Sequence, residues 1–276
     1  MVWHARLELD YRLEAQRCVA RYAHSGPLRI LQNLYPEGDG ICHNVLVHPP
    51  GGLVEGDTLA IDVSVAQGAH ALVSTPGATR FYKSNGQAAT QTVRLRLEPH
   101  ARLEWLPLET IAYPGCQAVN QLQLDLAPGA ELLAWDVTAL GLPGAQQPFD
   151  AGHLSQRLHW PGVWREEARL AATDTALLNS PMGLAGHRCM GTFVLASGTP
   201  MVNARREQLL ETVRAAVATH ALAATAGATC PNDQVLVVRT LSPLVEPAMD
   251  LFKHLWAQLR PVVWGLSNQP PRIWGV

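Results

Sequence analysis

The chain has 276 residues, of which 47% are hydrophobic and 16% are charged, and its net charge is −2. This length suffices for one large domain or two small ones, and the near-neutral charge gives no electrostatic reason to bind nucleic acid or an anionic membrane. A surface poor in charge also suggests that a partner protein covers some of its apolar area.

Cysteine use and hydropathy predict a cytoplasmic protein. The five cysteines are an odd number and contain no Cys-x-x-Cys pair. The first residues, Met-Val-Trp-His-Ala-Arg, lack the basic segment and apolar run of a secretory signal. No stretch of about 18 apolar residues is present to cross a membrane. We therefore expect reduced thiols in a cytosol.

The N-terminal part is predicted to be β structure. Residues 5–13 alternate between apolar and polar side chains, which is typical of a half-buried strand in an antiparallel sheet. Further short strands are expected at Cys18–Ala23, Leu28–Leu34 and Ile41–Val47.

The stretch from Val47 to Ser84 contains two loops of special geometry. Consecutive prolines and glycines at residues 49–52 form a rigid turn, and the acidic loop Glu55-Gly56-Asp57 follows it. A hairpin of two strands, 58–65 and 69–75, then leads to a polar cluster at residues 79–84. No Gly-Lys-Ser/Thr follows the glycines, which excludes a phosphate-binding loop.

A faint repeat of about 30 residues begins at Ala69, Ala101 and Ala130. Each copy has a turn, an alanine and a short apolar strand. Stacking such strands in layers would bring the strand ends carrying Thr75, Glu109 and Asp136 to one edge, with Asp57 nearby. An ordinary β-sandwich, whose short strands also recur regularly, explains the same pattern.

The C-terminal third changes in character. A strand pair is expected at 153–160 and 164–172, an irregular segment at 179–188, and a strand at 190–196. Helices are predicted at Arg205–Thr219, with Asn203 as N-cap, and from about Pro247 to Arg260, ended by Pro261. Two strands are expected between the helices, at His220–Ala226 and Gln234–Leu241.

These elements predict a mainly β fold, with many short strands in layered or stacked sheets and two α-helices in the C-terminal third. No clear domain boundary interrupts the sequence. We expect a single domain over residues 1–276, with a β body over about 1–200 and a helix-containing part over about 201–276.

Three acids stand out as candidates for function: Asp57, Asp136 and Glu109. Sparse carboxylates are hard oxygen ligands past which a divalent cation can move without being trapped. Asp136 follows Trp135 inside an apolar strand, where an unpaired charge is costly, so it must be paired or face a watered cavity. As ordinary loop acids, all three would be solvated or would serve as turn partners.

Other residues are weaker candidates. Glu55 and Glu166 could extend the acidic set, and Thr75, Thr79 and Ser84 could add neutral oxygens. Adjacent residues on a strand point to opposite faces, so Cys42 and His43 cannot easily share an ion, whereas His187 and Cys189 could. Two ligands alone do not make a metal site. Cys116 would need a neighbouring base to act as a nucleophile.

Several strings in one order resemble the signature of the urease accessory protein family UreD, also called UreH. They are His48-Pro-Pro-Gly-Gly-Leu-Val-Glu-Gly-Asp57, Thr75-Pro-Gly-Ala-Thr-Arg-Phe-Tyr-Lys-Ser84, Leu106-Pro-Leu-Glu-Thr-Ile111, Trp135-Asp-Val-Thr-Ala-Leu-Gly141 and Pro270-Pro-Arg-Ile-Trp274. The resemblance covers nearly the whole chain. Glu55 stands where a glycine is common in the family.

The resemblance implies a non-enzymatic factor that helps to insert nickel into apo-urease. Its implied partners are UreF, the GTPase UreG and apo-urease, with a two-to-two assembly with UreF. Nickel would be in transit through an internal acidic tunnel, and no cofactor would be tightly bound. Asp57 and Asp136 match family positions proposed to line that tunnel, and Glu109 lies in a matching motif.

Two other hypotheses remain open from the sequence. One is a β-rich hydrolase that uses Asp57 and Asp136 as paired carboxylates. The other is a binding scaffold whose tunnel carries no metal.

Overall fold

The computed structural model describes residues 2–275. The first half of the chain consists of strands, whose bounds are β1 His4–Glu14, β2 Arg17–Ser25, β3 Arg29–Ile30, β4 Ile41–Val47, β5 Thr58–Val65, β6 His70–Ser74, β7 Thr79–Phe81, β8 Ala89–Leu97, β9 Arg102–Leu106, β10 Thr110–Ala112, β11 Cys116–Leu126 and β12 Glu131–Leu140. The second half mixes strands and helices: β13 Gly152–Trp160, β14 Trp164–Ala171, α1 Thr175–Asn179, β15 Cys189–Ser197, α2 Asn203–Ala218, β16 Ala226–Thr229, β17 Val235–Ser242 and α3 Val245–Trp264.

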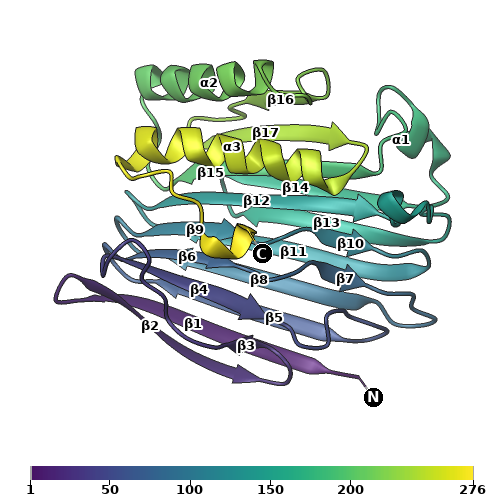
Figure 1. Ribbon diagram of the computed structural model, residues 1–276, viewed down its shortest axis with the longest axis horizontal. Coiled ribbons are helices and arrows are strands. Elements are labelled where there is room, and N and C mark those ends of the chain that lie inside the picture. Colours follow the sequence, from purple (N-terminus) through teal and green to yellow (C-terminus); the bar gives the residue numbers. More distant parts are fainter. Residues whose placement is uncertain (1, 276) are drawn as a thin grey trace.

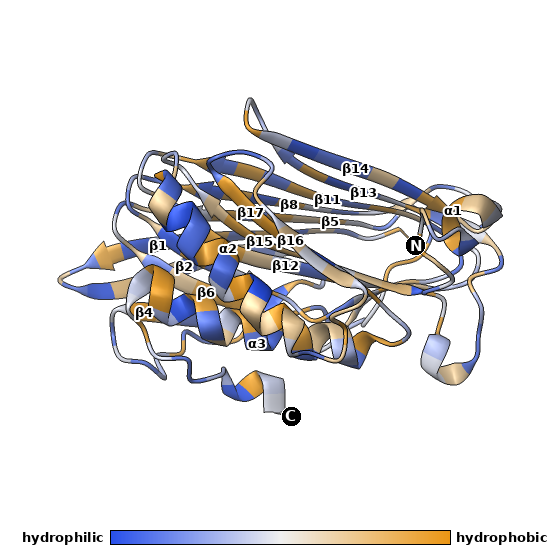
Figure 2. Cartoon of the chain, turned by 90° about the horizontal axis from the view of Figure 1, so that it is seen from above, coloured by the Kyte–Doolittle hydropathy of each residue, from blue (hydrophilic) through white to orange (hydrophobic). Residues whose placement is uncertain are grey.

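The strands of residues 2–275 form two facing sheets, and the two long helices cover one of them. The seven-stranded sheet has the order β14-β13-β11-β8-β5-β1-β2, and the ten-stranded sheet contains the path β16-β17-β15-β12-β9-β6-β4-β3. From β1 at the bottom of Figure 1 to β17 at the top, successive strands are stacked broadly in chain order. Helices α2 and α3 pack on the outer side of the ten-stranded sheet (Figure 2). The mainly β, layered fold with two long C-terminal helices is therefore confirmed.

The 30-residue repeat corresponds to one turn of this stacked arrangement. The repeated strands β6, β9 and β12 pair in parallel, and Arg102 N–H donates to the Ala69 carbonyl at 2.9 Å. The residue before each repeat alanine has a left-handed backbone: φ is 72° at Gly68, 61° at His100 and 77° at Gly129. Glycine adopts this conformation freely, which explains its use at two of the three turns.

The predicted hairpin of residues 58–75 is wrong. Strand β5 pairs in parallel with β1 and β8, whereas β6 belongs to the other sheet and pairs in parallel with β4 and β9. The turn at Gln67-Gly68 therefore carries the chain between layers. Strand β1 pairs antiparallel with β2 but in parallel with its other neighbour, β5, which is in turn parallel to β8, so the expected antiparallel sheet is largely a parallel one.

Several local predictions in the C-terminal third also need correction. Residues 220–225 form turns instead of a strand, and only Ala226–Thr229 pairs with β17. Asn203 is inside α2, where its side chain accepts a hydrogen bond from Arg206, and Val202 is the N-cap. Pro261 lies within α3 because the helix continues to Trp264 and ends at Gly265, whose φ is 67°.

The predicted strand at Leu28–Leu34 shrinks to Arg29–Ile30, with one isolated bridge at Leu34. The short helix α1 precedes the segment expected to be irregular. The strand pair β13–β14 and the apolar stripe of α3 are confirmed.

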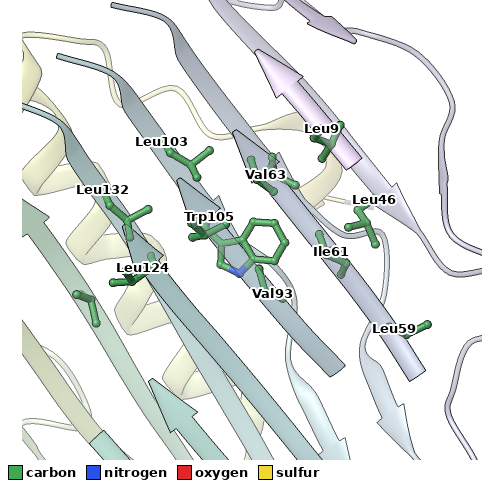
Figure 3. Close-up of a cluster of buried hydrophobic side chains, with 14 of the residues drawn as sticks. Leu9, Leu46, Leu59, Ile61, Val63, Val93, Leu103, Trp105, Leu124 and Leu132 are labelled. Carbon is green, nitrogen blue, oxygen red and sulfur yellow. The ribbon is translucent and has the colours of Figure 1, made fainter. Parts of the chain in front are cut away.

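Two separate cores follow from the three layers. The first lies between the sheets and contains Leu9, Ile61, Val93, Leu103 and Leu132 (Figure 3). The second lies between the ten-stranded sheet and the helices. Strand β12 serves both, because Ala134 faces the other sheet while Leu133 and Trp135 face the helices. A polar residue on the Ala134 face of β12 must therefore lie in the space between the sheets.

Within residues 2–275, no helix combines the length and the apolar character that crossing a membrane requires.

Candidate functional site

A cavity of about 120 Å³ lies between the two sheets, inside an otherwise apolar core. Its lining extends from Leu46 and Ile61, on β4 and β5, to Glu166 on β14. Strands β5 and β14 are four strand spacings apart in the seven-stranded sheet, which is about 19 Å at 4.8 Å per spacing. The cavity is thus elongated across the strands, from β4 and β5 at one end to β14 at the other.

Asp136 is the acid at the centre of this cavity. It lies on the inward face of β12, between the buried residues Ala134 and Thr138. Its Oδ1 accepts hydrogen bonds from the Thr138 hydroxyl at 2.7 Å and from the Gln156 amide at 3.1 Å. Its Oδ2 accepts one from the Asn120 amide at 3.2 Å. All three donors are neutral.

Burial raises the pKa of the Asp136 carboxyl, and the hydrogen bonds from Thr138, Gln156 and Asn120 offset part of that rise. None of the ion pairs within residues 2–275 involves Asp136. When the carboxyl is ionised, amide and hydroxyl dipoles alone hold its negative charge. A hydrated cation that enters the cavity would meet a carboxylate that no basic side chain neutralises.

The amide donors come from a polar row that crosses the seven-stranded sheet. Gln91, Asn120 and Gln156 pair in register on β8, β11 and β13, and Gln91 donates to Asn120 at 3.3 Å. Each of the three interrupts an apolar inward face at the same level. The sequence carries this signal, because a single polar residue stands among inward-facing apolar residues in each strand, but only the register between the strands brings the three together.

Thr75 and Thr79 also line the cavity. The Thr75 hydroxyl oxygen accepts from Leu108 N–H at 2.9 Å, which joins the end of β6 to the segment after β9. Thr79 lies on β7, and its N–H donates to the Glu109 carbonyl at 2.9 Å. Both hydroxyl-bearing residues therefore belong to the same polar region as Asp136.

Asp57 lies outside the cavity lining. Its Oδ1 accepts from Trp3 N–H at 2.8 Å, and its Oδ2 accepts from Val54 N–H at 2.9 Å. Asp57 is 7% exposed and ties the N-terminal segment to the start of β5. Strand β8 separates β5 from β11, so Asn120, which donates to Asp136, is on the order of 10 Å away across the sheet. The structure does not bring Asp57 and Asp136 together as a catalytic pair.

Glu109, Glu55 and Ser84 also lie outside the lining. Glu109 lies near enough to Cys189 for its charge to act on that thiol: burial, and then the charges of Glu246 and Glu109, raise the pKa of the Cys189 thiol to about 12. Glu55 is exposed, and its carboxylate lies over Gly86. The Ser84 hydroxyl donates to the Gln87 carbonyl at 2.8 Å.

The candidate cysteine and histidine ligands lie in structural positions. His43 is hydrogen-bonded to Glu37 at 2.9 Å, and Cys42 faces Asn44. Burial raises the pKa of the Cys116 thiol to about 11, which disfavours the thiolate that a nucleophile needs. Over residues 2–275, no three His, Cys, Asp or Glu side chains are grouped so that they could hold an ion.

Comparison of the sequence with known proteins identifies one family. The sequence model described as "UreD urease accessory protein" matches residues 4–275. The chain belongs to the UreD family. A protein from Albidiferax ferrireducens named "Urease accessory protein UreD" is 58% identical over 276 residues, which cover 100% of both chains. Proteins of the same name from Variovorax paradoxus and Polaromonas naphthalenivorans are each 57% identical, over 99% and 100% of both chains.

UreD proteins are urease accessory proteins, so the chain has a role in urease maturation as an accessory factor and not as an enzyme. The family resemblance found in the sequence motifs is confirmed. Two of those motifs, the strings around Thr75 and Asp136, line the cavity from the ten-stranded sheet, at strands β6 and β12.

Proposed function

We propose that this UreD protein passes nickel to apo-urease through the cavity between its two sheets. In this proposal it acts in a complex with UreF and the GTPase UreG, with two copies each of UreD and UreF. Nickel is the cargo and is not retained. The observation that carries the proposal is the Asp136 carboxylate, which lines an elongated internal cavity and is held there by neutral donors alone.

The chemistry of the lining supports a moving ion. Oxygen donors come from Asp136, from threonine hydroxyls and from the amide row, and these hard ligands leave a divalent cation partly hydrated. The lining residues include no histidine or cysteine, the ligands that hold nickel and zinc firmly. Apolar residues, among them Trp105, Leu122 and Leu158, make up much of the remaining wall, together with Gln121, Arg157 and Glu166. Contact with an ion at so few points favours transfer over storage.

The test replaces Asp136 with asparagine, which keeps the size of the side chain and removes its charge. Urease, UreF and UreG are co-expressed with the variant, and the nickel content and activity of the urease are measured. Asp125→Asn is the matched control, because Asp125 is exposed on the outer face of the seven-stranded sheet. We expect Asp136→Asn to lose most of the nickel transfer while it still binds its partners, and Asp125→Asn to keep it.

Equal activation by the two variants would refute the passage and favour a scaffold that carries no metal. Loss of partner binding by Asp136→Asn would instead show a structural defect. Asp136→Leu provides a second variant, which removes both the charge and the hydrogen bonds. The hydrolase alternative has no geometric support, because Asp57 and Asp136 face different surroundings.

A further inference from the structure

One end of the cavity lies at Glu166, on the edge strand β14 of the seven-stranded sheet. Glu166 is opposite Leu158 in the β13–β14 pairing, and it lies on the same face of β14 as the buried Leu170. It therefore points inward, and it lines the cavity. Its outer neighbours Arg165 and Glu167 are on the opposite face, where they pair with each other at 2.6 Å.

An ion pair between the two sheets crosses this end. The Arg239 guanidinium, from β17 of the ten-stranded sheet, donates to Glu166 from Nε at 3.2 Å and from Nη2 at 2.5 Å. Strands β14 and β17 belong to different sheets and lie in the two different layers of Figure 2. The Glu166–Arg239 contact therefore spans the space between the layers where the seven-stranded sheet ends.

A continuous row of inward residues connects Asp136 to this ion pair. Asp136 is directly opposite Thr192 on β15, and Thr192 is directly opposite Arg239 on β17. Two strand spacings, about 10 Å, thus separate the Asp136 and Arg239 positions. Thr192 also lines the cavity. The route from the central carboxylate toward β14 ends at the guanidinium of Arg239.

We propose that the Glu166–Arg239 ion pair is a latch that closes this end of the cavity. While it is closed, Arg239 places a positive charge at the opening and occupies the carboxylate of Glu166. When Arg239 swings away, the opening widens and Glu166 becomes the second free carboxylate on the path from Asp136. The use of this opening by a cation rests on the proposed function, whereas the closure itself does not.

The exposure of the pair fits a latch that opens easily. The side chains of Glu166 and Arg239 are 32% and 50% exposed. Ion pairs in contact with water are weak, because water solvates both charges when they separate. At the upper end of the usual strength of such pairs, the closed state is favoured about fivefold over the open state.

The test measures access to the cavity without nickel. Thr192→Cys places a thiol behind the latch, and Cys230→Ser removes the one partly exposed native thiol among the five. The measured quantity is the rate at which a small neutral reagent, methyl methanethiosulfonate, modifies this introduced thiol. The rate is compared with and without Arg239→Gln in the full chain bound to its partners. We expect Arg239→Gln to raise the rate about fivefold, the bias that the ion pair provides.

Arg165→Gln is the matched control, because it breaks an ion pair of the same kind on the outer face of the same strand. It should leave the rate unchanged. Exchanging the two residues, Glu166→Arg with Arg239→Glu, should restore the slow rate. An unchanged rate in Arg239→Gln, an equal rise in Arg165→Gln, or a failure of the exchange to restore the slow rate would each overturn the latch.

These results are separable from the nickel test. Normal urease activation by Asp136→Asn together with faster labelling in Arg239→Gln would refute the nickel passage and leave the latch in place. Loss of activation in Asp136→Asn together with an unchanged labelling rate in Arg239→Gln would support the nickel passage and refute the latch.

Discussion

The docking of α3 depends on a buried charge network, and breaking it provides a quantitative test of the structure. Arg260 is 0% exposed and donates to Glu37 from Nη1 at 2.6 Å and from Nη2 at 2.8 Å, and to Glu104 from Nε at 3.2 Å. Glu104, on β9, also accepts from Trp256 and is hydrogen-bonded to His70. The change is Arg260→Met, which keeps an unbranched, flexible side chain and removes the charge and the donors.

The expected cost is large because two carboxylates lose their cation. Glu104 is 0% exposed and the side chain of Glu37 is 10% exposed, so water does not replace the guanidinium. Removing one partner of a buried ion pair costs about 3–5 kcal/mol. With an m-value of about 3 kcal/mol/M in urea, the unfolding midpoint should fall by about 1 M or more.

The assay is urea unfolding followed by tryptophan fluorescence. Arg205→Met is the control, since Arg205 also pairs with a glutamate, Glu131, but its side chain is 37% exposed. That variant should lose about 1 kcal/mol or less. Adding Glu104→Gln to Arg260→Met should recover part of the loss, because it removes an uncompensated buried charge. A loss below 1 kcal/mol in Arg260→Met, or no recovery in the double variant, would refute this account of the network.

Two further predictions concern the packing and charge of the same helical layer. Although burial raises it, hydrogen bonds from His43 and Arg260 lower the pKa of Glu37 from 4.5 to about 2, and at about 1.36 kcal/mol per unit this contributes about 3 kcal/mol. The contribution is present above pH 4.5 and lost as the pH falls to about 2, so the wild type should exceed Glu37→Gln in unfolding free energy at pH 7 and match it near pH 2, and a gap independent of pH would contradict this. A Cβ on Gly191 of β15 would lie 2.7 Å from Phe252 of α3, so Gly191→Ala should cost about 1–3 kcal/mol in thermal or urea unfolding. Gly227→Ala on β16, where a Cβ meets nothing within 4 Å, should be near neutral, and equal effects of the two would refute the packing argument.

The sequence by itself determined the β character of the chain and the family, and it showed the 30-residue repeat without deciding between stacked layers and a β-sandwich. Period-two alternation fixed β1, and apolar runs between turn residues fixed β6, β9 and β12, because these patterns depend only on neighbouring residues. The helical stripe of α3 was equally local. Local patterns also placed Asp136 in an apolar strand, which correctly implied either a paired carboxylate or a cavity.

Only the tertiary structure decided which strands are neighbours and which polar residues meet. The turn at Gln67-Gly68 can close a hairpin or carry the chain to another layer, and the choice depends on burial of both faces of the stack. The roles of Asp57 and Asp136 were also decided there, because the sequence grouped the two acids as one set, whereas the Asp57 carboxylate accepts hydrogen bonds from backbone N–H groups and Asp136 lines the cavity. The pairing of Glu166 with Arg239, 73 residues apart, depends on the positions of both sheets. Contacts between layers are set by the packing of whole elements, and no window of sequence contains that information.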